Sequence, residues 1–346
     1  MSEMFYNNKN FNIDISNWDT SKVKYMRNMF FGTNFDQPVG KWDVSNVEDL
    51  SWMFNYASKF NQDLQNWNLV KLKKATYPFY NASLFNGKIP YKLIEINDNL
   101  DAYFLGTSFN QDISDWDVTH IKSMNGTFRE NDFFNQDIST WDVSNVTNMH
   151  GMFFDNEAFN FPLNSWDVSS VTDMSQMFHT ARGFDQNLSD WDVSNVTNME
   201  RMFLEADSFN QDISNWDVSN VTDMSRMFDS ADIFNQSLSK WNLESVENTT
   251  KMVLASGISL QNSTETIENW WKNNYQNISW DKDYIDNEVI DESKLADRNW
   301  IINSKKIDDA PVSSSVSSST QEDTAVEITL LATDVEDDTL TYLVVT

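Results

Sequence analysis

The stretch FNQDISNWDVSNVTDMSRMF, residues 209–228, recurs 25 residues earlier as FDQNLSDWDVSNVTNMERMF and 25 residues before that as FNFPLNSWDVSSVTDMSQMF. The tryptophans that follow this interval without a slip are Trp116, Trp141, Trp166, Trp191, Trp216 and Trp241. Two phenylalanine series run in step with them, one through Phe228 and one through Phe234. Periods of this length are typical of solenoids and propellers, in which stacking buries what one unit cannot bury alone. The sequence therefore predicts a repeat structure over residues 1–256.

Each unit contains two local patterns. The spacing Ile-x-x-Trp-x-Val at 213–218 is that of a leucine-rich repeat and predicts a short strand with one face inward. The segment 221–231 offers Thr222 or Asp223 as an N-cap and then apolar residues at three-four spacing, which predicts a short helix. A propeller blade needs about 40 residues, so it is excluded. We expect a leucine-rich-repeat-like solenoid with one short strand and one helical turn per 25-residue coil.

Composition narrows the class of partner. The chain has 346 residues, with 53 acidic against 24 basic ones and a formal charge of −29, which disfavours nucleic acid and anionic lipid surfaces. It has no cysteine, and no apolar run approaches the roughly 18 to 20 residues of a membrane helix, so we expect no membrane insertion in this segment. Residues 1–12 have the spacing of the second half of a repeat, so we expect an N-terminal part of the first repeat to precede them.

The repeat also carries a resemblance. The pattern I-x-x-W-D-V-S-N-V-T-x-M-x-x-M-F-x-x-A-x-x-F-N-Q, over residues 4–256, resembles the BspA-like leucine-rich repeat surface proteins. In particular it is similar to a bacterial surface-protein repeat of about 26 residues found in mycoplasma lipoproteins. The resemblance implies a solenoid exposed on a cell surface, with a role in adhesion or host contact and without catalytic residues.

One polar position of the unit predicts a column of carboxylates on the binding face. Its members are Asp117, Asp142, Asp167, Asp192 and Asp217. Stacked strands lie about 4.8 Å apart, and neighbouring charges at that distance repel by about 0.9 kcal/mol in water. Either each carboxylate accepts hydrogen bonds from the Ser and Asn amides that follow it, as in an Asx turn, or the column holds weak Ca²⁺ sites.

An irregular stretch interrupts the acidic background. Between Lys59 and Lys92 there are six lysines and one acid, and the Trp and Asp series are lost there. The candidate binding residues in this stretch are Lys71, Lys73, Lys74 and Tyr91. They predict contact with an acidic partner or a glycan; the alternative is a drifted repeat whose lysines pair with acidic neighbours.

The period stops near residue 257. We expect a helix with Ser263 or Thr264 as N-cap to close the solenoid within 257–306, followed by a linker at 307–320. Residues 321–346 resemble the start of a cadherin-like or immunoglobulin-like module, a partial β-sandwich. That resemblance implies Ca²⁺ binding by Asp334, Glu336, Asp337 and Asp338.

The sequence offers no nucleophile–base pair, glycine-rich loop or metal-ligand cluster, so we expect no enzyme. The expected role is a secreted or surface-displayed scaffold that binds a protein or glycan of another cell or of the matrix. No cofactor is expected, and Ca²⁺ is the one candidate ion. The alternative is a structural stalk, stiffened by Ca²⁺, that presents other domains.

Overall fold

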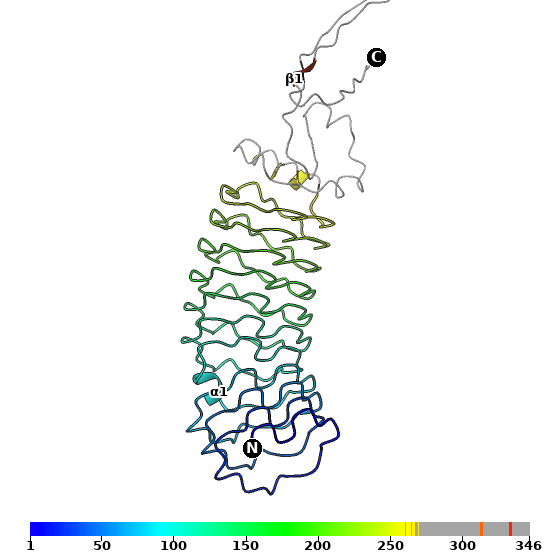
Figure 1. The fold of residues 1–346 in the computed structure, drawn as a ribbon. Coiled ribbons are helices and arrows are strands. Elements are labelled where there is room, and N and C mark those ends of the chain that lie inside the picture. The colour runs from blue at the N-terminus through cyan, green and yellow to red at the C-terminus, as the bar shows by residue number, and fades with distance from the viewer. Residues whose placement is uncertain (260, 264, 267–268, 270–311, 314–331, 334–346) are drawn as a thin grey trace, which may run out of the picture.

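The computed structural model describes residues 1–259, 261–263, 265–266, 269, 312–313 and 332–333. Residues 1–259 wind into similar coils that lie one above the next along the molecule (Figure 1). The labelled elements are the helix α1 (Lys92–Glu95) and the antiparallel strands β1 (Val312–Ser313) and β2 (Ala332–Thr333). The predicted repeat is therefore present, and it is built largely without helices or strands. No helix in the described ranges is long and apolar enough to cross a membrane.

The C-terminal predictions are only partly covered by these residues. Residues 261–263, 265–266 and 269 are helical, inside the segment where a capping helix is expected. Strand β1 falls within 307–320, the segment expected to be a linker, and strand β2 falls within 321–346; the expected domain bounds stay a prediction. The candidate calcium ligands lie outside the described residues; they are Asp334, Glu336, Asp337 and Asp338.

The recurring aromatic residues form the core. Within one coil the rings of Phe228 and Phe234 stack with centroids 3.9 Å apart, and the next Phe of the first column, Phe203, lies 5.6 Å from Phe228. Trp216 is 3% exposed, and its indole N–H donates to the carbonyl of Leu188 in the preceding coil at 3.0 Å. Since each ring contacts its own coil and the next, the apolar column holds the stack together, as the period predicts.

The strand predicted over 213–218 does not form. The backbone N–H of Trp216 instead donates to the Ile213 carbonyl at 3.1 Å, which closes a tight turn. Neighbouring coils pair at isolated parallel bridges farther along, such as that between Asn198 and Asp223. The chain must turn at each coil edge to bring the large indole inward, so this segment is not extended.

The helix predicted after Thr222 is also wrong. The N–H groups of Arg226 and Phe228 donate to carbonyls of the next coil at 2.9 and 2.7 Å, whereas Met227 donates three residues back, to Met224. Arg226 has a φ of 54°, as the third residue of a type II turn requires. An α-helix would use every amide within itself; here alternate amides join the coils.

A ladder of polar side chains runs beside the aromatic core. Oδ1 of Asn210 accepts the N–H of Asn235 at 2.8 Å and the side-chain amide of Gln236 at 2.9 Å. The same arrangement starts at Asn12 and recurs along the stack, with Asp36 and Asp185 taking the acceptor position in two of the coils. This explains the recurring letters Phe-Asn-Gln, because either an amide or a carboxylate oxygen accepts both bonds.

Candidate functional site

The five aspartates predicted to line the binding face lie at tight turns on the surface. Oδ1 of Asp142 accepts the N–H of Ser144 at 3.1 Å and its hydroxyl at 2.6 Å. The other four, Asp117, Asp167, Asp192 and Asp217, accept the equivalent N–H at 3.0 to 3.1 Å. These hydrogen bonds lower the pKa of Asp142 below its ordinary 3.8 and outweigh the nearby charge of Asp117. The predicted Asx turn is therefore confirmed: each of these aspartates accepts the backbone N–H of the serine or threonine two residues after it.

The asparagine after that serine has a different role from the one predicted. Asn145 does not donate to Asp142; its side-chain amide donates to the Thr119 carbonyl of the preceding coil at 2.8 Å. Asn195 and Asn220 do the same. Across the described residues, no group of three or more His, Asp or Glu side chains is arranged to hold a metal ion. Calcium binding by the column of aspartates therefore stays a prediction, because the described residues show no arrangement of ligands for the ion.

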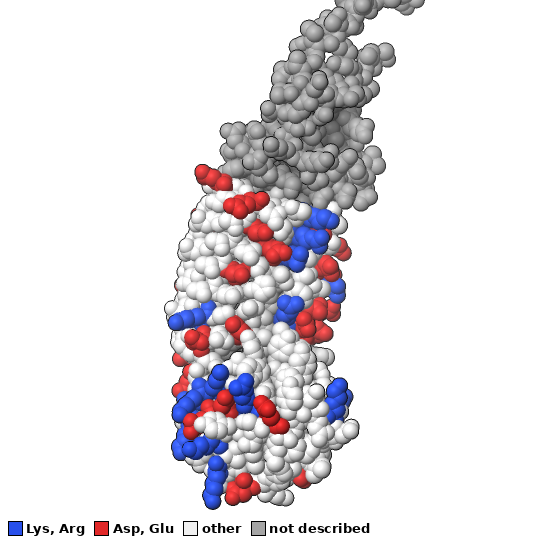
Figure 2. Space-filling view, viewed as in Figure 1, with Lys and Arg blue, Asp and Glu red and all other residues white. Residues whose placement is uncertain are grey.

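The candidate lysines are engaged by the coil before them. Lys73 Nζ lies 2.6 Å from Glu48 Oε2, and Lys71 Nζ donates to Asn46 Oδ1 at 2.6 Å. Lys74 forms a backbone bridge with Asp49. Figure 2 shows basic side chains gathered near the N-terminal end of the stack with acidic ones among them. Pairing with an acidic neighbour, the alternative interpretation of the sequence, is therefore confirmed for Lys73.

One histidine lies against a serine, a contact that the sequence did not reveal. His150 Nδ1 is 2.6 Å from Ser175 Oγ, and that hydroxyl donates to Asp173 Oδ1 at 2.6 Å. The histidine and the serine lie 25 residues apart, so the contact joins neighbouring coils.

A cavity of about 670 Å³ opens where the tryptophan series is interrupted. Lys92 stands 25 residues after Trp67 and 24 before Trp116, in the place of the missing indole. The chain there turns into the single helical turn α1, which follows Pro90 and buries Leu93 and Ile94. Two aliphatic side chains thus enter the core of this coil, and no large ring covers its outer part.

Tyr103 fills the inner part of the gap. Its ring lies edge-on to Phe79 with centroids 6.4 Å apart, whereas in a regular coil Trp141 lies at the same distance from Phe128 but tilted by 32°. The hydroxyl of Tyr103 donates to the Leu93 carbonyl at 3.0 Å. The tyrosine is fully buried, so the core stays closed and the cavity lies outside it.

Trp116 is the indole that borders the cavity. Its ring stacks on Trp141 with centroids 6.3 Å apart and an interplanar angle of 9°. Trp141 is 3% exposed and donates its indole N–H to Ile113 at 3.0 Å. Trp116 is only half-buried and, among the described residues, its indole N–H has no acceptor. The ring face toward the preceding coil is therefore available.

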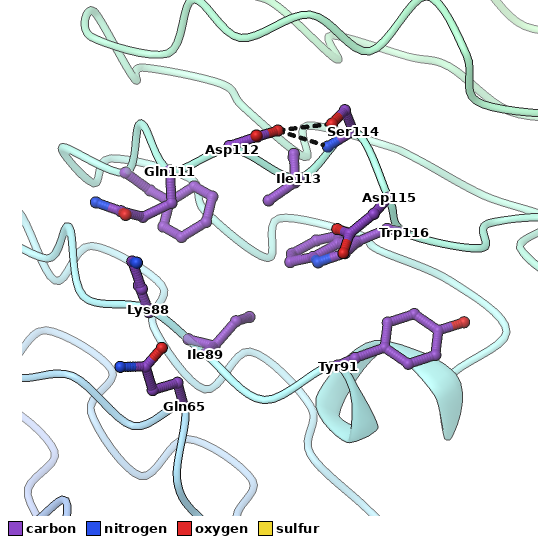
Figure 3. Close-up of a pocket in the computed structure, with 11 residues that line it drawn as sticks. Gln65, Lys88, Ile89, Tyr91, Gln111, Asp112, Ile113, Ser114, Asp115 and Trp116 are labelled. Atoms are coloured by element: carbon purple, nitrogen blue, oxygen red, sulfur yellow. Dashed lines mark hydrogen bonds between the residues drawn. The ribbon is translucent and has the colours of Figure 1, made fainter.

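Polar side chains surround this face. Gln65, Lys88, Ile89 and Tyr91 line one side of the cavity, and the segment 111–116 lines the other (Figure 3). The Tyr91 hydroxyl donates to the Asp117 carbonyl at 2.9 Å, so two of the predicted binding residues do meet. Burial, together with the charges of Asp117 and Glu95, raises the pKa of Tyr91, which keeps the phenol protonated. The arrangement is suited to binding by stacking and hydrogen bonds.

The sequence predicted Tyr91 as a binding residue of this region, but it did not predict a role for Trp116, Gln65 or Gln111. The available signal was the 24-residue interval from Lys92 to Trp116, which marks a lost tryptophan beside a retained one. Because the register of the irregular stretch was ambiguous by one residue, the side of the coil that would open was not predicted.

A family model described as "Mycoplasma protein of unknown function, DUF285" matches residues 1–92, 98–194 and 161–270. The unmatched residues 93–97 overlap α1, whereas the residues that line the cavity lie inside the matched stretches. No curated protein matches the chain. Since the matches cover well over half of the 346 residues, the chain belongs to this mycoplasma repeat family.

Proposed function

We propose that the chain is a non-catalytic scaffold, secreted or displayed on a cell surface, that binds a protein or glycan of another cell or of the matrix. The observation that carries this proposal is the cavity beside Trp116, where an indole face and several polar side chains are left open. Ligand sites in proteins are typically concave, with aromatic side chains and a few convergent polar groups. The proposal includes no chemistry by the chain itself.

Two resemblances support display outside the cell. The repeat is similar to that of BspA-like leucine-rich repeat surface proteins, and residues 321–346 resemble the start of a cadherin-like module. A leucine-rich-repeat-like stack would present one long surface with a site at a defined height. Solenoids generally bind through such extended surfaces.

The second candidate is a structural stalk. The observation that favours it is the continuity of the phenylalanine column: Phe79 and Phe104 remain stacked even across the irregular coil, at 6.5 Å. A rod of this kind would hold other domains away from the cell without a ligand of its own.

The experiment that separates the two uses the full chain, immobilised, to retain ligands from a bacterial and host-cell surface extract. Trp116→Ala is compared with Trp52→Ala, a half-buried tryptophan of another coil that lies under Arg27. The scaffold predicts a retained ligand that is lost with Trp116→Ala and kept with Trp52→Ala. Retention of nothing by the wild-type chain, or equal retention by both variants, would favour the stalk.

A further inference from the structure

We propose that the cavity at Trp116 binds a neutral sugar ring, stacked on the indole face that the missing tryptophan leaves open. This inference rests on the proposed function and names the ligand class of the same site. Its starting point is the spacing of the tryptophan column, in which neighbouring indoles lie nearly parallel, as Trp191 and Trp216 do at 6.3 Å and 6°.

The geometry provides a flat apolar platform and room above it. Trp116 is fixed from behind by Trp141 and from the core side by Phe104 and Phe109, at 6.1 and 6.4 Å. The indole therefore cannot turn away when a ligand arrives, which limits the entropic cost of binding. The volume of about 670 Å³ exceeds that of one indole and accommodates a six-membered ring with its substituents.

The rim carries both donors and acceptors. Gln111 uses its amide N–H to bond Asn86, which leaves the amide oxygen for a ligand. Asp112 uses Oδ1 to accept from Ser114, and Asp115 makes no hydrogen bond within the described residues. Figure 3 shows Asp115 beside the indole and Lys88 on the opposite side of the cavity. A sugar ring has an apolar C–H face and hydroxyls around its edge that both donate and accept. The C–H face suits the indole, and the hydroxyls suit the polar side chains of the rim.

The charged side chains of the rim disfavour an anion and a purely apolar ligand. An anion would face Asp112 and Asp115 with only Lys88 to attract it, in a chain of net charge −29. A cation would be repelled by Lys88 but attracted by Asp112 and Asp115, so the charge of the rim does not exclude it, and the charged probe below tests that class. A purely apolar ligand would remove two carboxylates and an ammonium from water without replacing their hydrogen bonds. A neutral, hydroxyl-rich ring meets none of these penalties.

The test is isothermal calorimetry of the full chain with glucose, galactose, N-acetylglucosamine and their β-linked trimers, and with a trimethylammonium compound and a sulfated sugar as charged probes. We expect at least one neutral sugar to bind. Trp116→Ala should weaken that sugar at least about tenfold, the factor that 1.4 kcal/mol of lost stacking gives. Asp115→Ala, at an exposed residue that holds no part of the fold, should weaken it at least about threefold, and Trp52→Ala should leave it unchanged.

The outcomes separate this inference from the proposed function. If the chain retains a surface ligand through Trp116 but binds none of the neutral sugars, the sugar inference is wrong and the scaffold stands. Sugar binding that survives both Trp116→Ala and Asp115→Ala also overturns it. Preference for either charged probe has the same consequence. If Trp116→Ala does not fold, Asp115→Ala alone decides.

Discussion

Truncating one buried tryptophan tests whether the aromatic column stabilises the stack. Trp166 is 3% exposed, and its indole N–H donates to the Ile138 carbonyl at 3.0 Å. A buried tryptophan covers about 150 to 250 Å², which at about 25 cal/mol per Å² is about 4 to 6 kcal/mol as an upper estimate. Measured truncations of buried aromatic residues cost about 3 to 5 kcal/mol. We therefore expect Trp166→Ala to lower the free energy of unfolding by about 4 kcal/mol.

Trp116→Ala is the matched comparison for that variant. One face of this ring borders the cavity and, in the described part of the chain, its N–H stabilises nothing, so we expect a loss of about 2 kcal/mol. Hydrogen exchange read by mass spectrometry is the suitable assay, because each coil contacts only its neighbours and global two-state unfolding is not assured. Trp166→Ala should raise exchange in its own and adjacent coils only. Equal losses for the two variants, or a change spread evenly over residues 1–259, would refute the reasoning.

Three further predictions concern other parts of the stack. Burial lowers the pKa of His179 from 6.5 to about 4, so the unfolded chain takes up a proton before the folded chain does as the pH falls from 6.5 to 4. The free energy of unfolding should therefore drop by at most about 3 kcal/mol over this pH range. His179→Leu should make the urea midpoint depend less on pH between pH 7 and 5 than it does in the wild type. Asn110→Ala removes the side-chain acceptor of the Asn135 N–H and of the Gln136 amide and should cost about 1 to 2 kcal/mol by urea unfolding, whereas Asn110→Asp should cost less than about 0.5 because a carboxylate oxygen replaces the acceptor beside uncharged rungs. Millimolar Ca²⁺ should leave hydrogen exchange in residues 1–259 unchanged, since the Asp oxygens already accept protein hydrogen bonds; slower exchange there would favour the stiffened stalk.

The core was predictable because a fixed aromatic interval has one physical solution. Rings that recur every 25 residues must stack if each unit is to bury them, and Phe203, Phe228 and their equivalents do so. The local backbone was not predictable from the same residues. Consecutive turns with hydrogen bonds three residues back place side chains at the same spacing that a helix would use. The left-handed φ values at Arg226 and Ser230 occur without glycine, and glycine marks the equivalent positions in only a few coils, at Gly32, Gly106, Gly126 and Gly151, so the turn signal in the sequence is weak.

The candidate site was predictable as a region and not as a structure. The loss of tryptophan at Lys92 and the nearby Tyr91 are plain in the sequence, as is the change in charge. The closing of the core depends on Tyr103, which replaces a methionine of the repeat and bonds Leu93 ten residues back. That compensation is a tertiary contact, and it decides whether a missing ring leaves a core defect or an outer cavity.

The way the stack crosses the irregular coil argues that the cavity is a built feature. The polar ladder continues there, since Asn86 Oδ1 accepts the Asn110 N–H at 2.8 Å. The phenylalanine column continues too, although Phe79 and Phe104 are 6.5 Å apart where Phe203 and Phe228 are 5.6 Å apart. The tryptophan column is interrupted, as are the aspartate series and the row of backbone bridges, which passes from Asp49–Lys74 to Asn99–Ser123 without a bridge between Lys74 and Asn99. In a structure where each coil contacts its neighbours alone, such a loss has a local cost. A repeat protein can therefore give up a side chain in one coil for a ligand site while its phenylalanine column and polar ladder continue, and the coil that lacks its tryptophan is where such a site belongs.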